Sequence, residues 1–262
     1  MRIVVCGDIV GAPGRRVFRR AAPRFRSELG ADLIVVNGEN AAGGRGVTRA
    51  VAEELFSAGA DVITLGDHAW DQKEIMGFIG DTERLLRPAN YPPGVPGRGC
   101  CVVETPFGRV LVVNLLGRVF LPPVADCPFR TADAILQAEA EGVAVRIVDF
   151  HAEATSEKKA LGWYLAGRVT AVVGSHTHVA TADEAVLPGG TAYITDMGMT
   201  GPHDSVLGRD KESVLQKFLT GLPARFKVAS GGVACEAVLI EADERTGRAE
   251  AIRRIRWEEG KL

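Results

Sequence analysis

The sequence predicts an α/β fold in which short buried strands alternate with amphipathic helices. The first observation is a set of short apolar segments rich in β-branched residues, at 2–6, 32–36, 61–65, 143–150 and 170–173. The second is that most of these segments are followed by helical periodicity or by a helix-capping signal. The third is that polar residues follow each segment, at the strand ends where open α/β sheets bind their ligands.

The composition is that of a globular protein and excludes several function classes. The chain has 262 residues, of which 46% are hydrophobic and 24% charged. This is enough for one large core, and no repeat or linker divides it, so we expect a single domain over 1–262. The 31 basic and 33 acidic residues give a net charge of −2, which argues against stable DNA binding and against a membrane-surface role.

The termini and the cysteines predict a cytoplasmic protein. The first ten residues form too short an apolar run for a signal peptide. No apolar run approaches the roughly eighteen residues of a membrane span, so no contact with a membrane is expected. The five cysteines form no CxxC pair, which indicates reduced thiols. The sequence leaves the oligomeric state open, with a homo-oligomer among the alternatives.

The first half of the chain is expected to contain three strand–helix units. The helix after the first strand carries six arginines opposite its apolar face, for which a solvated surface and a phosphate or RNA contact are the alternatives. Thr48 is positioned to cap the second helix. Asp71 and Glu74 have capping-box spacing before the apolar residues of 75–79, which predicts a third helix.

The second half is expected to be richer in strands. Its turns are marked by glycine, and capping residues mark the start of its helices. The expected elements are, in order, a proline-rich surface segment at 84–96, a hairpin of 100–104 with 109–115, a helix at 129–141 followed by Gly142, the strand at 143–150, a helix capped by Thr155 or Ser156 that ends at Gly167, the strand at 170–173, a strand pair near 185–195, a glycine-rich loop at 196–203, and a closing hairpin of 234–242 with 248–257.

The polar residues that follow the predicted strands form one chemical set. Each alone has a structural explanation, such as a helix cap, a turn or a satisfied strand terminus. The set contains four of the five histidines and no lysine. Carboxylate and imidazole ligands suit Zn, Mn, Fe and Co, so the joint pattern predicts a metal site. The residues are Asp8, Glu39, Asn40, Asp67, His68, His151, His176 and His178.

The number of candidates predicts two ions. A single catalytic ion typically uses about three protein ligands, whereas these candidates fit two ions about 3.5–4 Å apart that share a carboxylate bridge. Such a pair polarises phosphate oxygens, lowers the pKa of a bridging water towards ~7 and aligns that hydroxide for in-line attack. In an extended loop the rings of His176 and His178 would point to opposite sides and serve different ions.

Two other kinds of site fit the sequence less well. Gly7, Gly11 and Gly14 suggest a dinucleotide-binding turn, but their spacing differs from G-x-G-x-x-G. Asp8 would also face the pyrophosphate at the start of the helix, where a carboxylate is repulsive. Ser175 precedes a histidine, but no G-x-S-x-G elbow of a serine hydrolase is present.

Six motifs occur in order between residue 2 and about residue 208: 7–8, 38–40, 66–68, 151–158, 174–178 and 196–202. Together they resemble the calcineurin-like metallophosphoesterases, and within them the YmdB-like branch of bacterial phosphodiesterases. Val10 stands where the wider superfamily has a histidine, and Glu39 where it has an aspartate. Both departures are features of the YmdB-like branch and sharpen the resemblance.

The resemblance implies a fold, an activity and a role for each residue. The fold is a four-layer α/β/β/α sandwich of two mixed sheets flanked by helices. The activity is hydrolysis of 2′,3′-cyclic nucleotides, or of RNA-derived phosphodiester ends, with Fe or Mn in the site and Zn or Co as further candidates. His68 would donate a proton to the leaving alkoxide or stabilise the transition state. One ion would be held by Asp8, Asn40 and His178, the other by Asp67, His151 and His176, with Glu39 as the bridge.

Asp67 departs from the resemblance, because the YmdB-like branch usually has asparagine before the catalytic histidine. Two divalent ions carry a charge of +4, and a bridging hydroxide with Asp8 and Glu39 carries −3, so the net charge of the site is +1. An ionised Asp67 brings this net charge to zero. We hypothesise that Asp67 favours a more highly charged ion, such as ferric iron, or weakens the pair as a Lewis acid. The alternative is that aspartate ligates as asparagine does.

Other polar residues have both structural and functional interpretations. Asn90 and Tyr91 could border the substrate, with the Tyr91 ring stacked on a base, or they could anchor their loop. His203 lies in the glycine-rich loop, which could be a lid over the cleft, or it is a surface histidine. Glu153 and Lys158 could support a metal ligand or serve as charges at a helix start.

The sequence is therefore compatible with three functions. The first is a metal-dependent phosphodiesterase whose substrate is a nucleotide or RNA fragment. The second is a regulatory or scaffold protein with a largely structural metal site. The third is a phosphomonoesterase.

Overall fold

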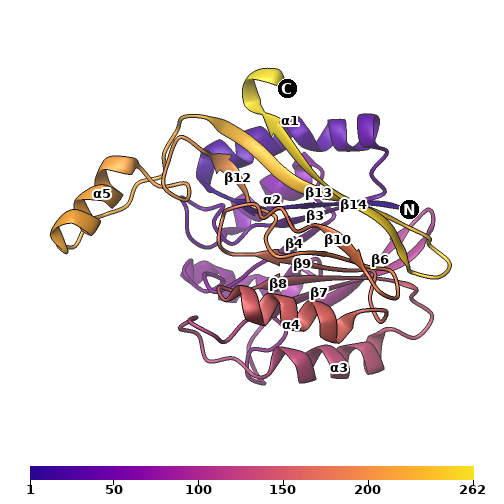
Figure 1. Ribbon diagram of the computed structural model, residues 1–262. Helices are drawn as coiled ribbons and strands as arrows, with labels where there is room; N and C mark the ends of the chain where they lie inside the picture. Colours follow the sequence, from indigo (N-terminus) through magenta and orange to yellow (C-terminus); the bar gives the residue numbers. More distant parts are fainter.

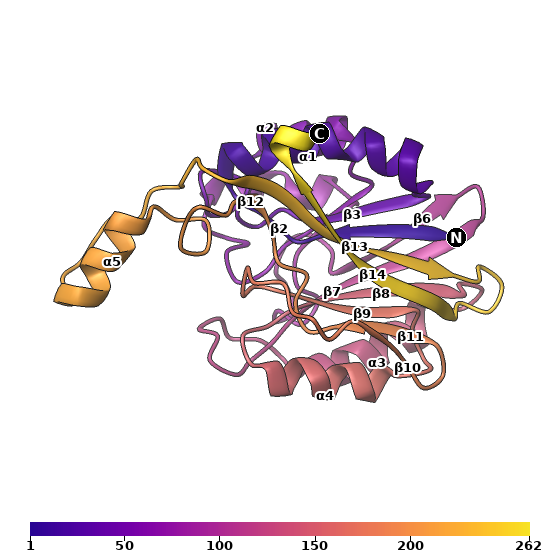
Figure 2. The ribbon, with the colours of Figure 1, turned by 45° about the horizontal axis from the view of Figure 1, so that its top comes forward.

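The computed structural model describes residues 1–262 and contains two β-sheets packed face to face (Figure 1). Each sheet has both parallel and antiparallel strand pairs, so both are mixed. α1 (Gly11–Leu29) and α2 (Arg49–Ala58) lie outside one sheet, and α3 (Pro128–Glu139) and α4 (Thr155–Leu165) lie outside the other (Figure 2). The predicted four-layer sandwich is confirmed.

In both sheets, strands that are far apart in the sequence lie side by side. The eight-stranded sheet has the order β2 (Asp8–Ile9), β12 (Met199–Pro202), β13 (Val233–Ala242), β1 (Arg2–Cys6), β3 (Leu33–Asn37), β4 (Val62–Thr64) and β5 (Leu85–Leu86), with β14 (Ala249–Glu258) paired to β13. The six-stranded sheet has the order β10 (Ala185–Leu187), β11 (Thr191–Ile194), β9 (Ala171–Ser175), β8 (Val145–His151), β7 (Gly108–Leu116) and β6 (Cys100–Thr105).

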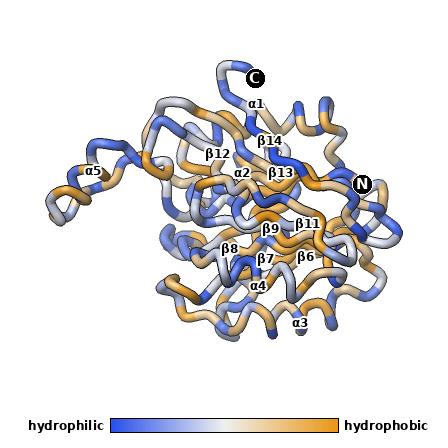
Figure 3. The backbone as a smooth tube through the Cα atoms, viewed as in Figure 1, coloured by the Kyte–Doolittle hydropathy of each residue, from blue (hydrophilic) through white to orange (hydrophobic).

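The core follows from the two-residue period of the strands. Along β1, Ile3 and Val5 pack between the two sheets, whereas Val4 and Cys6 pack against the layer of α1 and α2. A third cluster fills the space between the six-stranded sheet and its helices. Figure 3 shows that the central strands carry the most hydrophobic residues of the chain. None of the five α-helices combines the length and apolar character that a membrane-spanning segment requires.

Most of the expected elements are present, including the hairpins of β6 with β7 and of β13 with β14. Thr48 caps α2 as predicted, because its hydroxyl accepts a hydrogen bond from Val51 N. The arginine face of α1 is largely engaged in ion pairs: Arg15 contacts Glu54, Arg16 contacts Glu259 and Arg24 contacts Glu28. Of the two alternatives for this face, a solvated surface therefore applies to Arg15, Arg16 and Arg24.

The prediction of a helix after Asp71 is wrong. The chain forms two short 3₁₀ turns instead, η1 (Lys73–Gly77) and η2 (Ile79–Asp81). The Glu74 carboxylate does not close a capping box, since it accepts a hydrogen bond from Arg49 N at 2.8 Å. Gly77 and Gly80 also weaken a longer helix. Similarly, Ala154 and not Thr155 or Ser156 precedes α4, with no side-chain cap.

Two further segments differ from the expectation. The proline-rich segment is not wholly a surface excursion, because Leu85 and Leu86 form the buried edge strand β5. After residue 210 the chain forms α5 (Lys211–Thr220), a helix that is not among the predicted elements. Asp210 caps this helix by accepting a hydrogen bond from Ser213 N, and the helix projects from the sandwich (Figure 1). A last 3₁₀ turn, η3 (Glu259–Lys261), ends the chain.

Candidate metal centre

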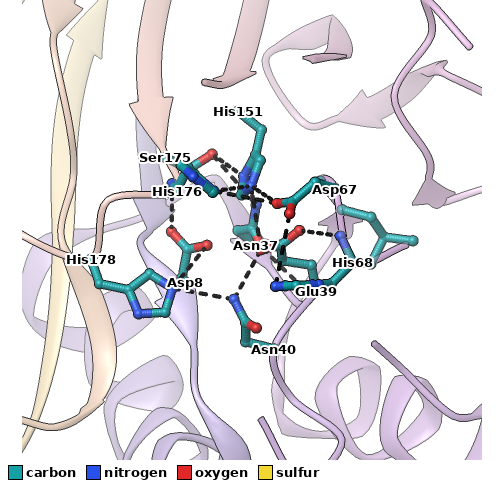
Figure 4. A network of polar contacts seen from close by, with 12 residues as sticks. Asp8, Asn37, Glu39, Asn40, Asp67, His68, His151, Ser175, His176 and His178 are labelled. Atoms are coloured by element: carbon teal, nitrogen blue, oxygen red, sulfur yellow. Dashed lines mark hydrogen bonds and ion pairs between the residues drawn. The ribbon is translucent and has the colours of Figure 1, made fainter. Parts of the chain in front are cut away.

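The polar residues predicted from the strand ends gather at one edge of the two sheets (Figure 4). In one sheet, Asp8 begins β2 just after the end of β1, and Glu39 with Asn40 and Asp67 with His68 follow β3 and β4. His151, and His176 with His178, come from the ends of β8 and β9 in the other. Because the neighbouring strands within each set are parallel, their carboxyl ends meet at the same edge.

Asp67, His151 and His176 form one group, named here the Asp67 group. Asp67 Oδ1 lies 3.0 Å from His151 Nε2 and 3.3 Å from His176 Nδ1. Glu39 Oε1 lies 3.3 Å from the same His151 nitrogen. One ligand atom from each of these four residues lies within 4.8 Å of the others. These residues could hold a metal ion.

Asp8, Asn40 and His178 form a second group, the Asp8 group, on the other side of Glu39. Asn40 Nδ2 donates to Glu39 Oε1 at 2.9 Å and lies 3.2 Å from His178 Nε2. The same His178 nitrogen lies 3.7 Å from Asp8 Oδ1. That Asp8 oxygen is buried and has no hydrogen-bond partner. Glu39 thus contacts a side chain of each group, and the two groups also meet where Asp8 Oδ2 accepts a hydrogen bond from His176 N at 3.2 Å.

The electrostatics of the centre favour a cation. Burial, together with the charges of Asp67 and Asp8, raises the pKa of Glu39 well above its usual value. Burial would also raise the pKa of Asp67, but hydrogen bonds from His151 and His176 hold it well below its usual value. Burial lowers the pKa of His151, which favours the neutral imidazole that a metal ligand requires. The carboxylates and the neutral imidazole therefore fit a metal site.

The backbone at Gly66 leaves room for these ligands. A Cβ atom at this position would lie 2.3 Å from Glu39 Oε2 and 2.4 Å from His151 Nε2. Any side chain would therefore displace the groups that make up the centre. This steric requirement explains why glycine precedes Asp67.

Three buried side chains support His151 from behind. Its Nδ1 lies 3.1 Å from Ser175 Oγ and 3.4 Å from the Asn37 amide nitrogen. Ser175 Oγ donates to Asp149 Oδ1 at 2.7 Å, so its oxygen is left to accept the proton of His151 Nδ1. When an ion is bound, this tautomer would leave the Nε2 lone pair for the ion, in place of the Nε2 contact with Asp67 Oδ1. Burial raises the pKa of Asp149 to about 6.

A buried ion pair holds the loop that carries His176 and His178. Lys158 Nζ donates to Asp196 Oδ2 and to Ser175 O, both at 2.7 Å. The same Asp196 oxygen accepts Thr177 N at 3.0 Å. His176 and His178 both have positive φ, 103° and 64°, so the loop is not extended as expected, although the two rings do reach different groups.

His68 lies in a hollow of about 310 Å³ beside the two groups. Its Nδ1 is 3.1 Å from Asp71 Oδ2, and its backbone N–H donates to Glu39 Oε2. Arg45 and Arg209 line the same hollow, which gives it two cations outside the carboxylate cluster. The hollow can accept an anionic group next to the candidate metal ligands.

The remaining candidates do not face this hollow. The Asn90 amide is buried and bonds backbone atoms of Leu116 and Asp126, so it anchors a loop. The Tyr91 ring is buried beside Trp70 and cannot stack on a base. His203 Nδ1 accepts a hydrogen bond from Arg256 at 3.2 Å. Residues 199–202 of the expected lid form the buried strand β12, and Leu207 of the loop that follows lines the hollow. These placements correct the substrate-contact interpretations.

Three residues near the site, Arg45, Asp149 and Arg209, were not predicted from the sequence. A fourth, Glu153, has a more specific role than predicted. Glu153 contacts His176 Nε2 at 3.0 Å rather than His151. Arg45 stands in a Gly43-Gly44-Arg45-Gly46 turn, a signal that was available in the sequence. Asp149 is a lone acid inside an apolar strand, which also marks it, because a carboxylate is costly to bury. Nothing in the sequence marks Arg209.

Comparisons with known proteins agree with this geometry. A family model described as YmdB-like protein matches residues 4–255. The 2′,3′-cyclic-nucleotide 2′-phosphodiesterase of Bacillus subtilis is 49% identical over 255 residues, 97% of this chain and 96% of the relative. A crystal structure of a hypothetical protein from Thermus thermophilus has a TM-score of 0.92 at 43% identity and covers 99% of this chain and 100% of its own. A phosphatase structure from Mycoplasma pneumoniae also has a TM-score of 0.92, at 35% identity, covering 98% of this chain and 93% of its own.

Proposed function

The chain belongs to the YmdB-like family, and on that premise we propose that it is a metal-dependent phosphodiesterase acting on 2′,3′-cyclic nucleotides. The observation that carries the proposal is the arrangement of two ligand groups around one shared carboxylate, Glu39. The name of the Bacillus subtilis relative supplies the substrate class. RNA fragments that end in a cyclic phosphate belong to the same class.

The two groups would hold two transition-metal ions, with Fe or Mn preferred and Zn or Co as alternatives. Asp67, His151 and His176 would hold one, Asp8, Asn40 and His178 the other, and Glu39 would contact both. When bound, such a pair polarises a phosphate and activates water for in-line attack. The buried Asp8 oxygen without a partner supports the second position, because an ion there would satisfy it.

His68 would donate the proton that the leaving alkoxide needs. Its side chain is about one quarter exposed, whereas the His151 ring is fully buried, so it can reach a substrate in the hollow. Contact with Asp71 Oδ2 at Nδ1, at 3.1 Å, orients the ring. Nε2, 3.8 Å from Asp67 Oδ2, would face the phosphate.

Arg45 and Arg209 would bind the phosphodiester anion. Arg209 is held by a hydrogen bond to Gly44 O, and burial together with the charge of Arg45 lowers the pKa of its guanidinium. The two guanidinium charges repel each other, and a bound phosphate would relieve that repulsion. The hollow therefore has two cations for a phosphate beside the candidate metal ligands.

The test compares His68→Ala with His203→Ala, a histidine outside the hollow. Turnover is measured on 2′,3′-cyclic AMP, on a chromogenic diester and on the matching monoester, together with metal content by elemental analysis. We expect His68→Ala to lose about 100- to 10,000-fold in turnover with metal content unchanged. His203→Ala should match the wild-type protein.

Other outcomes would support the alternative functions. No turnover of any ester by the metal-loaded wild-type protein would indicate a regulatory or scaffold protein whose metal site is structural. Faster turnover of the monoester than of either diester would indicate a phosphomonoesterase. Two transition-metal ions per chain in the purified protein would support the dinuclear proposal, and one ion would contradict it.

A further inference from the structure

A second polar hollow, of about 400 Å³, lies at the end of the sheets opposite the candidate metal centre. Its lining comes from the turns that precede β8 and β9 and from the turns that join β10 to β11 and β13 to β14. The candidate metal ligands follow β8 and β9, so the two hollows are at opposite ends of the same strands. Four arginines and no carboxylate are among its lining residues.

Two of the arginines are fixed by the fold. The Arg146 guanidinium donates to the carbonyl oxygens of Val143, Arg168 and Ala140, at 2.9, 3.0 and 3.3 Å. These carbonyls orient the guanidinium but do not neutralise it. Arg168 contacts Asp133 at 2.6 Å and lies over the Tyr164 ring, so this second cation is held in place as well.

The other two arginines are free to bind a ligand. Arg245 and Arg248 stand on the turn between β13 and β14, and both are exposed. Neither forms an ion pair or a side-chain hydrogen bond. The nearby Asp243 carboxylate is engaged by the backbone N–H groups of Arg245 and Thr246, at 2.8 and 3.1 Å. It therefore stabilises the turn that presents the two free side chains.

Close packing of the turns keeps the hollow in shape. A Cβ atom at Gly190, where φ is 84°, would lie 2.8 Å from Arg248 Cβ. Gly190 O also accepts a hydrogen bond from Ala249 N at 2.7 Å, next to Arg248. The β10–β11 turn thus supports the stem of Arg248 directly.

From this arrangement we propose that the hollow binds a small anion that carries two or more phosphate groups. Guanidinium groups bind phosphate oxygens through paired hydrogen bonds. Of the four arginines that line the hollow, Arg245 and Arg248 have no ion pair and Arg146 bonds only carbonyl oxygens, whereas Arg168 is paired with Asp133. The volume suits a small molecule rather than a protein surface. No aromatic ring lines the hollow, so its recognition is directed at phosphate and not at a nucleobase.

The experiment is calorimetric titration of the full-length, metal-loaded protein with inorganic pyrophosphate, and separately with ADP. The test variant is Arg245→Ala with Arg248→Ala, and the charge-matched control is Arg19→Ala with Arg253→Ala, two exposed arginines without ion pairs. The loss of charge-assisted contacts should weaken binding at this hollow about tenfold or more for both ligands. The control should stay within about twofold of wild type.

Several results would overturn the proposal. They are no binding of pyrophosphate by the wild-type protein, an equal loss in the test and control variants, no loss in the test variant, or a loss confined to ADP. A crystal structure with pyrophosphate seated only at the metal centre would also overturn it. Hydrolysis of 2′,3′-cyclic AMP should be the same in the test variant and the wild type, so failure here is distinguishable from failure of the proposed catalytic function.

Discussion

The Asp67 group and the Asp8 group flank the same carboxylate, Glu39, but they are held in different ways. In the Asp67 group, His151 and His176 contact Asp67 and each other, and a chain of hydrogen bonds continues behind His151 through Ser175 to Asp149. In the Asp8 group, the closest approach of His178 to Asp8 is 3.7 Å, and one buried Asp8 oxygen has no partner.

The Asp67 group is therefore preorganised by protein contacts, whereas the geometry of the Asp8 group depends on the ligand that binds to it. His151 is fully buried, and its orientation is fixed by residues behind it. The His178 ring is held at Nδ1 by a single contact to Leu207 O at 3.1 Å. We therefore expect changes to the two groups to act separately on the two proposed ions.

Glu39→Gln should have the largest effect, because Glu39 is the carboxylate common to both groups. The proposed ions would supply several kcal/mol of transition-state stabilisation, so turnover of the diester should fall about a thousandfold. Elemental analysis should find both ions reduced. Glu28→Gln, on the exposed face of α1, is the control. Loss of one ion with the other fully retained would show that Glu39 does not serve both groups.

Ser175→Ala should have an intermediate effect that is confined to the Asp67 group. The variant removes the acceptor for His151 Nδ1 and leaves the buried Asp149 without one of its donors. The affinity for one ion should fall about 10- to 100-fold, with a similar loss of turnover. Metal titration monitored by elemental analysis measures the effect, with Ser156→Ala at the exposed start of α4 as control. An equal weakening of both ions would contradict the separation of the groups.

Much of the fold and of the ligand set could be predicted, because these features depend on residues that are close together in the sequence. Each buried strand is a short apolar run, and each candidate ligand directly follows such a run. Parallel strands then bring their ends together without any further information. The failures at η1 and η2 have a local cause too, since Glu74 bonds Arg49 N rather than its own helix start.

The supporting contacts could not be predicted, because they join segments far apart in the sequence. Asp149 bonds Thr64, 85 positions away, and the pairing depends on how the two sheets face each other. Arg209 reaches the hollow through a contact with Gly44 O, 165 positions away. The left-handed backbone at His176 and His178 is likewise set by tertiary contacts, because residues other than glycine seldom adopt positive φ without them.

Asp67→Asn should have the smallest effect, and it addresses the charge of the preorganised group. The amide oxygen of asparagine can occupy the place of Asp67 Oδ1 between His151 and His176, so the geometry of the group should persist. Removing one negative charge makes a pair of divalent ions a stronger Lewis acid, and turnover with Mn, Co and Zn should rise about threefold. Reconstitution with each metal, at equal metal content, measures this change. Equal or slower turnover with all three metals would mean that aspartate ligates here as asparagine does, and that the extra charge does not set the reactivity of the centre.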